Sequence, residues 1–419
     1  MKITKKSKML MSFFTKHKNT SHIEHTSRTN IIIRELYHHI LNAYNYLLQL
    51  KQTQGTHFYN ITVKKIHTPS QIIRPTKFNS NSFPKEIRKH IDELSVTELC
   101  YRFSLLNRNI KLYFIVEEAN VELKIDDYNS HVDAIIMWLY VLTEYASKSC
   151  ASNLVIYFYF TSLEKHLPNS TIEILNENNV NTAFTTTCPK DSEIVVYRKE
   201  EWFKVFIHES LHNFAIDFSD MDNSVCSRII LRIFPVESDV NLYESYTEFW
   251  AEIMNALFCS FFLLKEKTNM EEFLSHSEFF INFERRYSFF QLVKTLRFMG
   301  LTYTDLYSKN VNSKIMRDTL YKENTNVLSY YVIKTILLNN YPGFLFWCKK
   351  NNTSLLQFKK TLFNQTLFCK FISNNYKKSS MLEGVDTSQT FLNNLYLKDK
   401  KMYEKYVLTN LRMSICEMG

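Results

Sequence analysis

Two histidines and a glutamate stand at a spacing that could hold a catalytic metal. His208, Glu209 and His212 form an HExxH pentad within the apolar-periodic segment 199–218. On an α-helix, residues four apart share one face, so both imidazoles could bind a single Zn²⁺ while Glu209 takes a proton from a metal-activated water. A core helix whose histidines only hydrogen-bond to the backbone is the alternative, but the motif in this setting favours a metal site.

A third protein ligand could come from a row of glutamates in the segment 241–252. Glu244, Glu248 and Glu252 repeat every four residues and therefore share one face of the expected helix. One carboxylate could bind the metal, and the next could orient a ligand histidine through its second ring nitrogen. The alternative interpretation is an acidic face in contact with solvent.

The pentad and the later glutamates together resemble the gluzincin class of zinc metallopeptidases. In that class HExxH on one helix is joined by a glutamate from a later helix, often with an acidic residue four positions on. The resemblance implies one zinc ion per chain, a peptide or protein substrate, and Glu209 as general base. The wording of the motif is also similar to uncharacterised metallopeptidase-like proteins of large DNA viruses.

Two registers of the glutamate row fit the gluzincin pattern. Glu244 can be the ligand with Glu248 behind it, or Glu248 can be the ligand with Glu252 behind it. We favour Glu244, because the small residues Ser245 and Thr247 would let that helix approach the metal closely.

A metzincin-like pattern fits less well. It would require a glycine three residues after His212 and a histidine three residues later, where Ala215 and Phe218 stand. Asp217 lies at a different helical azimuth from His212, so we expect it to be at most a helix-end group or a support for a ligand.

Hydrolysis also needs a donor for the developing oxyanion. Tyr330 and Tyr331, on an expected C-terminal helix, offer phenols, and His276 offers an imidazole. Such residues are more often packing groups, and the sequence carries no geometry that would choose among them.

The flanking sequence predicts an α+β fold, in which an N-terminal mixed sheet packs on the HExxH helix and a mostly helical lobe follows. We assign the helices and strands from the period at which their apolar residues recur. We expect helices at 31–50, 130–147, 199–218, 241–264, 271–298 and 327–338, and strands at 57–66, 101–106, 110–116, 154–161, 180–187 and 193–197. Residues 180–185 stand where a gluzincin has the sheet-edge strand that pairs with extended substrate, although an interior strand fits the periodicity equally well.

The expected division of the chain has three parts. We expect residues 1–30 to form a basic, disordered tail and residues 31–218 to form the α+β lobe. We expect residues 219–419 to form the helical lobe that carries the third ligand. The tail holds seven basic residues against one acidic residue, and so accounts for +6 of the net charge of +9. Such a tail could touch nucleic acid or an anionic surface, or simply keep the chain soluble.

Composition excludes several other classes of protein. Only five glycines occur, so no phosphate loop or dinucleotide fingerprint can be assembled and no nucleotide cofactor is expected. The longest apolar run, 253–264, is too short for a transmembrane segment. The eight cysteines are scattered without motif spacing, which favours reduced thiols and a cytoplasmic or other reducing compartment, host cytoplasm or virion included if the source is viral.

The sequence therefore predicts a zinc-dependent peptidase. Two alternatives stay open. One is a catalytically inactive protein that keeps zinc for stability, which a site filled by both Glu244 and Glu248 would favour because it leaves no position for water. The other is a nucleic-acid or membrane-associated factor that acts through residues 1–30.

Overall fold

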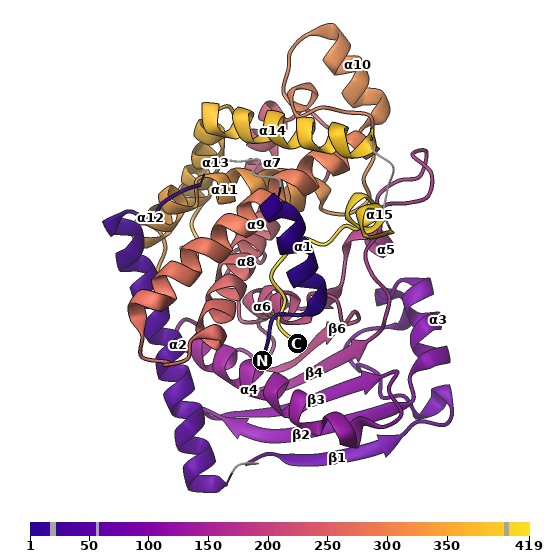
Figure 1. Cartoon of the computed structure of the whole chain (residues 1–419), viewed down its shortest axis with the longest axis vertical. Coiled ribbons are helices and arrows are strands. Elements are labelled where there is room, and N and C mark those ends of the chain that lie inside the picture. Colours follow the sequence, from indigo (N-terminus) through magenta and orange to yellow (C-terminus); the bar gives the residue numbers. More distant parts are fainter. Residues whose placement is uncertain (17–21, 56–57, 398–401) are drawn as a thin grey trace.

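A six-stranded mixed sheet forms the base of the molecule in the computed structural model, which describes residues 1–16, 22–55, 58–397 and 402–419 (Figure 1). The strand order is β1-β2-β3-β4-β6-β5. Strands β3, β4 and β6 run parallel, and the other neighbours pair antiparallel. The strands are β1 (Asn60–Lys65), β2 (Thr97–Leu105), β3 (Arg108–Val116), β4 (Asn153–Phe160), β5 (Ala183–Thr185) and β6 (Asp191–Val196).

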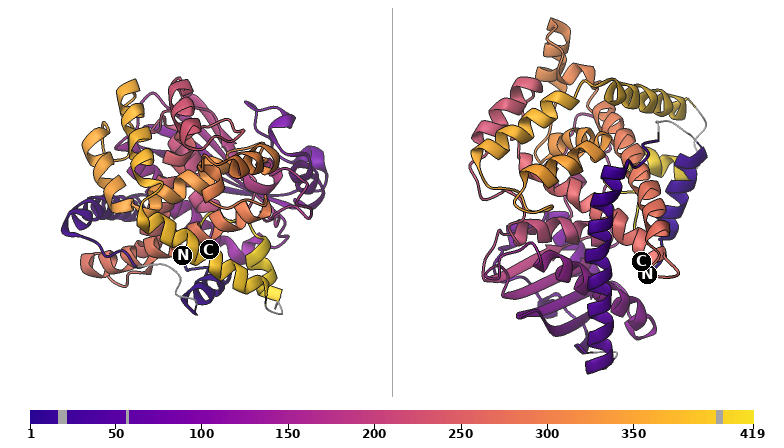
Figure 2. Two further views of the ribbon diagram at one scale, coloured as in Figure 1. Left: turned by 90° about the horizontal axis from the view of Figure 1, so that it is seen from above. Right: turned by 90° about the vertical axis from the view of Figure 1, so that its left-hand side faces the viewer.

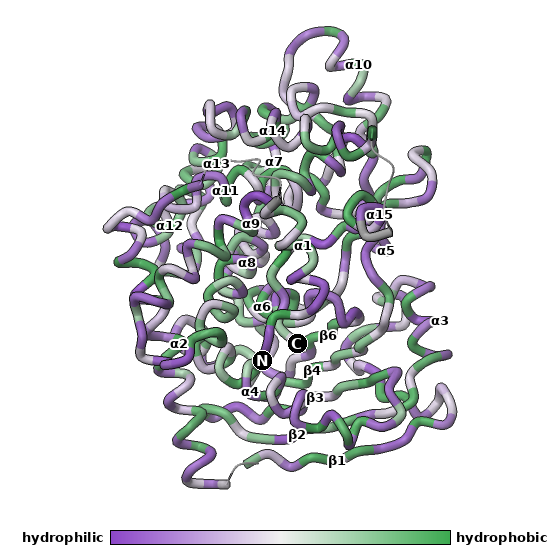
Figure 3. Tube along the Cα trace, viewed as in Figure 1, coloured by the Kyte–Doolittle hydropathy of each residue, from purple (hydrophilic) through white to green (hydrophobic). Residues whose placement is uncertain are grey.

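The hairpin of β2 and β3 is longer than expected and turns tightly. Leu106 and Asn107 both have positive φ, 46° and 67°, as a two-residue type I′ turn requires, and asparagine tolerates that conformation well. Hydrophobic and hydrophilic residues are interspersed along β2 (Figure 3), and its burial alternates from Tyr101 to Leu105, where Arg102 and Ser104 are exposed. The two strands expected at 101–106 and 110–116 thus pair antiparallel along their whole length.

Each face of the sheet is covered by different elements. On one face Phe114 and Phe158 belong to the large buried cluster that includes α4 (Ile125–Thr143) and α6 (Trp202–Asn213). On the other face Tyr157 and Tyr159 pack in a smaller cluster with α3 (Lys85–Leu94). Alternate residues of β4 thus serve two cores, which explains its nearly continuous run of apolar and aromatic residues.

A helical layer lies over α6. Helices α8 (Leu242–Leu263) and α9 (Met270–Phe298) pack on each other, and α8 packs on α6. The long helix α2 (Ser27–Gln54) runs beside the sheet layer and the helical layer and contacts α4, α8 and α9 (Figure 2). The remaining helices are α5 (Glu177–Val180), α7 (Ser224–Ile233), α10 (Val311–Leu320), α11 (Lys334–Asn339), α12 (Tyr341–Asn351), α13 (Leu362–Asn375), α14 (Ser379–Tyr396) and α15 (Met402–Thr409). The mixed sheet and the helical C-terminal region confirm the coarse fold class.

The N-terminal region departs from the expected disordered tail. Lys5–Lys16 forms a helix, α1, because Leu10, Phe13 and Phe14 share one face and are buried. Phe14 packs edge-on against Phe290 of α9, with ring centroids 5.1 Å apart. Residues 17–21 lie outside the described residues, and contact of residues 1–30 with nucleic acid or an anionic surface stays a prediction.

Two cysteines correct the expectation that all eight are reduced thiols. Cys150 and Cys188 form a disulfide across 38 residues. They precede β4 and β6, which are neighbours in register from Asn153 and Asp191, so the strand pairing brings the two cysteines together. Scattered positions in the sequence cannot reveal such a pairing, and the compartment of the protein stays a prediction. The other six cysteines are buried and free.

The N-terminal and C-terminal segments of the described chain pair with each other. Ile3 forms a β-bridge with Met418, and the amide of Thr4 donates to the carbonyl of Glu417 at 2.9 Å. One buried cluster runs from Leu10 to Met418 across the expected boundary at residue 218, and the division into lobes stays a prediction. None of the described helices combines the length and apolar character that crossing a bilayer requires.

Candidate metal centre

Helix α6 holds the pentad and is buried along its whole length. It ends earlier than expected, because Ala215 adopts a left-handed conformation with φ 55°. The amide of Ala215 donates to the carbonyl of His212 and that of Ile216 to the carbonyl of Leu211, each at 2.9 Å, which is the Schellman pattern of helix termination. The chain reverses direction at this turn, and Asp217 therefore lies next to the imidazole of His212.

Three side-chain atoms from α6 and α8 meet at one point. His208 Nε2 lies 3.1 Å from His212 Nε2 and 3.1 Å from Glu244 Oε2, and His212 Nε2 lies 3.3 Å from the same Glu244 oxygen. The histidines share a face of α6, and Glu244 comes from the first turn of α8. These are the residues of the described chain that could hold a metal ion.

The spacing of these atoms matches the ligand set of a zinc ion. Zinc bonds of about 2.0–2.1 Å in tetrahedral geometry separate ligand atoms by roughly 3.3–3.4 Å. The three observed separations of 3.1–3.3 Å are close to that value. Two imidazoles and one carboxylate are also the donor types of catalytic zinc sites, in which a fourth position stays open. The residues therefore fit Zn²⁺.

A carboxylate holds the other ring nitrogen of each histidine. Glu248 Oε2 lies 2.9 Å from His208 Nδ1, and Asp217 Oδ2 contacts His212 Nδ1. Asp217 is itself held by the hydroxyl of Thr247, which donates to Oδ2 at 3.2 Å. A proton on each Nδ1 leaves the lone pair of each Nε2 directed at the shared point, and so fixes the tautomer that binds metal.

The three glutamates of α8 have different surroundings. Glu244 faces the histidine Nε2 atoms, whereas Glu248 lies behind His208, between its Nδ1 and the ammonium of Lys204. Glu252 lies one turn further on and pairs with Lys334 at 2.5 Å, so it touches neither histidine. This placement corresponds to the register with Glu244 as ligand and Glu248 behind it.

The proposed oxyanion donors lie in different places. The hydroxyl of Tyr330 donates to Glu244 Oε2 at 2.9 Å and is at the site. Tyr331 donates to the carbonyl of Leu411 at 2.8 Å, and His276 lies on α9 near Glu272, so the structure brings neither to the histidines. Tyr330 lies in a π-helical segment, Leu328–Ile333, where a single helix had been expected; such turns are frequent at functional sites.

Glu209 lines a small pocket beside the histidines. Its carboxylate receives no hydrogen bond from any described residue. The pocket, about 40 Å³, has room for a few water molecules. Its walls are Lys165, Val180, Asn181, Thr182, Ala183, Lys204, Val205, His208, Glu209, Glu248, Tyr330 and Met413. Only Ala183–Thr185 of the expected strand 180–187 is extended, but it is the last strand of the sheet, as the edge-strand hypothesis requires, and it lies beside α6.

Burial and mutual contact shift the acidity of these groups. Burial raises the pKa of the Glu209 carboxyl above its usual range. Burial lowers the pKa of His212, but Asp217 and Glu244 outweigh it and leave that pKa well above its ordinary value. For Glu244 burial raises the pKa, but the neighbouring His212 and His208 outweigh burial and hold that pKa well below its usual range. Zinc must displace any proton on the two Nε2 atoms, so its binding weakens as the pH falls.

Sequence reasoning missed two functional neighbours. Lys204 stands one turn before His208, and its signal was a single charged residue within the otherwise apolar stretch 202–207. Met413, more than 200 positions from the pentad, also lines the pocket, and no sequence pattern pointed to it.

Comparison of the chain with protein-family models, curated proteins and solved structures finds no match. The functional argument therefore depends on the geometry of the site.

Proposed function

We propose that the protein is a zinc-dependent peptidase of gluzincin type. The observation that carries the proposal is the meeting of His208 Nε2, His212 Nε2 and Glu244 Oε2 at mutual distances of 3.1–3.3 Å. Carboxylates hold both histidines from behind, which is a costly arrangement for a site with only a packing role. A viral source, suggested by the wording of the motif, belongs to the same proposal.

The side chains around the ligands have separate roles in hydrolysis. Zn²⁺ bound at this point would lower the pKa of a water molecule to about 7 and polarise the substrate carbonyl. Glu209 takes the proton from that water and later delivers it to the leaving amine, a transfer that its raised pKa assists. Tyr330 can turn its hydroxyl from Glu244 towards the carbonyl oxygen and donate to the developing negative charge.

The substrate would lie along β5. Asn181, Thr182 and Ala183 form one wall of the pocket, and among the described strands β5 has a neighbour only on the side of β6. An extended peptide that adds to this edge would present its backbone to Glu209. The pocket of about 40 Å³ would then take only the part of the peptide that faces Glu209.

The test combines metal content with hydrolysis. Purified wild-type chain should carry about one zinc ion by plasma mass spectrometry and cleave members of a peptide library. His212→Ala should lose the metal and the activity. Glu209→Gln should keep the metal and lose hydrolysis by at least about 100-fold, because it lacks the base. Cleavage that survives in Glu209→Gln would contradict the mechanism.

The small pocket and the burial of the histidines favour a second candidate, a zinc-stabilised structural protein. A volume of about 40 Å³ and the near-complete burial of His208 and His212 suit a metal that holds α6 to α8. Zinc in the wild-type chain, together with no cleavage of any library peptide, would support this candidate over the peptidase.

A further inference from the structure

Helix α6 carries a lysine on the same face as the metal-binding histidines. Lys204 precedes His208 by four residues, is 2% exposed, and pairs with Glu248 Oε1. The other oxygen of that carboxylate lies 2.9 Å from His208 Nδ1. An ammonium, a carboxylate and an imidazole thus form one line of contacts that ends at the candidate metal.

We propose that Lys204 is a positioning residue that fixes the metal ligand His208 through Glu248. The inference deepens the proposed function and rests on it. A carboxylate with only one bonded oxygen can rotate about its last carbon–carbon bond, whereas Glu248 is held at both oxygens. The ammonium therefore sets the plane of the carboxylate, and the carboxylate sets the plane of the imidazole.

Charge gives a second reason for a cation at this position. Four carboxylates lie beside the two histidines. Those of Glu244, Glu248 and Asp217 contact the imidazoles directly, and that of Glu209 lines the neighbouring pocket. A divalent metal balances two of these charges, and Lys204 balances a third. A buried carboxylate without a partner is strongly destabilising, so this cation lets Glu248 remain beside the ligand rather than turn away.

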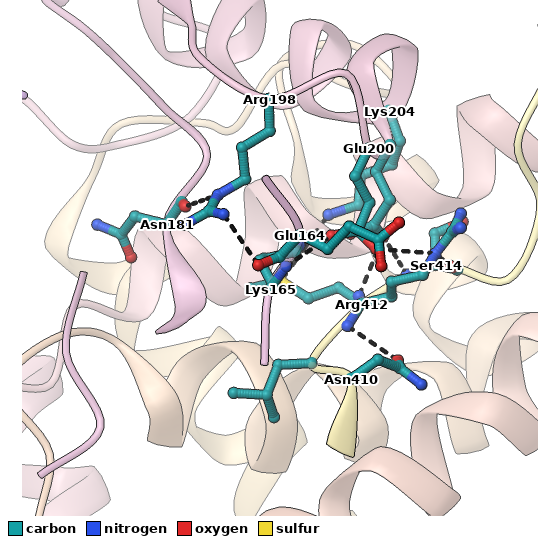
Figure 4. A network of polar contacts seen from close by, with 12 residues as sticks. Glu164, Lys165, Asn181, Arg198, Glu200, Lys204, Asn410, Arg412 and Ser414 are labelled. Carbon is teal, nitrogen blue, oxygen red and sulfur yellow. Dashed lines mark hydrogen bonds and ion pairs between the residues drawn. The ribbon is translucent and has the colours of Figure 1, made fainter. Parts of the chain in front are cut away.

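The surroundings of Lys204 prevent it from leaving this position. Met413 Sδ lies 3.8 Å from its Nζ. The segment that contains Met413 is anchored to Glu201, whose Oε1 accepts the amide of Met413 at 3.0 Å. Lys165 pairs with the other oxygen of Glu201 at 2.5 Å. Figure 4 shows Lys204 and Lys165 in one polar network with the C-terminal segment, at Arg412 and Ser414.

The chain offers a matched control. Lys334 is also fully buried and pairs at 2.5 Å with Glu252, one turn along α8 from Glu248 and out of contact with both histidines. Lys204→Met and Lys334→Met remove the same kind of buried ion pair. Only the first removes a direct partner of Glu248, the carboxylate beside His208; Lys334 also donates to the carbonyl of Met413 at 3.3 Å, so its substitution additionally controls for a disturbed C-terminal segment.

The experiment measures zinc affinity by competition with a chelator, on full-length protein. We expect Lys204→Met to weaken zinc binding about 10-fold and Lys334→Met to leave it unchanged. Circular dichroism of the metal-free variants checks that both fold. Equal zinc affinity of Lys204→Met and wild type, or equal losses in both variants, would overturn the inference. Wild-type protein that binds no zinc would instead contradict the proposed function, and the inference with it.

A double variant keeps the test decisive if Lys204→Met does not fold. Lys204→Met combined with Glu248→Gln removes both charges, and a neutral pair is less costly to bury than a single charge. If Lys204 acts through Glu248, the double variant should bind zinc as well as Glu248→Gln alone. A further loss of affinity in the double variant would show that Lys204 acts by another route and would overturn the inference.

Discussion

At the scale of single residues, the candidate site is defined by which oxygen meets which nitrogen. Glu244 and Glu248 are one helical turn apart and chemically identical, yet one faces the Nε2 atoms and the other faces a single Nδ1. Their substitution should therefore have different effects, although both would remove one carboxylate from the same helix.

Separate substitutions of these glutamates test that difference. Glu244→Ala should abolish zinc binding, because it removes one of three protein ligands. Glu248→Ala should retain zinc with an affinity lower by about 10 to 100-fold. Isothermal titration with zinc measures both. Loss of zinc only in Glu248→Ala would show that the other register is the right one.

His131 on α4 gives a pH-dependent prediction. Neither ring nitrogen has a hydrogen-bond partner in the part of the chain that the structure describes, and burial lowers its pKa from 6.5 to about 3, helped by Lys199. Below pH 6.5 the imidazole of His131 is protonated in the unfolded chain but stays neutral in the folded chain. The free energy of unfolding therefore decreases as the pH falls from 6.5 towards 3.

The loss from His131 at pH 5 should be about 2 kcal/mol. His131→Phe keeps the aromatic contacts with Tyr128 and Trp202 and should remove this part of the acid sensitivity. Urea denaturation of both proteins at pH 7.5 and pH 5 measures it, and the pH 7.5 pair reports any change in packing. An equal drop in both proteins would contradict the prediction.

The sequence was enough to predict the residues that share a helix face, and not those that meet across elements. The spacing in the pentad and in the glutamate row pointed to His208, His212 and a glutamate on the later helix, and the small residues Ser245 and Thr247 favoured Glu244 over Glu248. The contact of Asp217 with His212 depends on the left-handed Ala215, which no helical period anticipates. Tyr330 and Tyr331 could not be separated by sequence, because a π-helical segment decides which hydroxyl reaches Glu244.

At the scale of elements, α1 shows how a short amphipathic segment is misread. Its lysines suggested a disordered tail, but they lie around a face of Leu10, Phe13 and Phe14 that packs against α9 and α14. Net charge describes the exposed face of such a helix and carries no information about the buried one. Helices α8 and α9 were predicted to within one residue at each end and α2 and α4 to within five, whereas α14 was not among the expected helices.

Substitution within α1 tests its structural role. Phe14→Ala should lower the free energy of unfolding by about 3 to 5 kcal/mol, because it leaves a cavity among Tyr287, Phe290 and Phe391. Met9→Ala on the exposed side of the same helix is the control and should change stability little. Thermal denaturation followed by circular dichroism compares the two. Similar midpoints for Phe14→Ala and wild type would show that α1 does not stabilise the fold.

At the scale of the whole molecule, the candidate metal ligands come from helices of both expected lobes. His208 and His212 lie on α6, beside the sheet, and Glu244 lies on α8, within the helical layer. A metal bound at this point would link the two layers, so its removal should loosen their packing.

Zinc should therefore raise the thermal midpoint of the wild-type chain. At a free zinc concentration 100 times the dissociation constant the stabilisation is about 2.7 kcal/mol. Calorimetry with zinc and with excess chelator measures the shift, and His212→Ala should show none. A shift of the same size in His212→Ala would place the zinc elsewhere.

The position of residues 410–418 has a consequence for synthesis of the protein. Glu201 at the start of α6 bonds to the amides of Met413 and Ser414, and Met413 lines the pocket that contains Glu209. A ribosome that adds about 5 to 20 residues per second needs roughly 10 to 40 s to pass from the pentad to Met413. The pentad is therefore synthesised roughly 10 to 40 s before the residue that completes its pocket. Any hydrolytic activity requires that residues 410–418 have been made and have folded against α6.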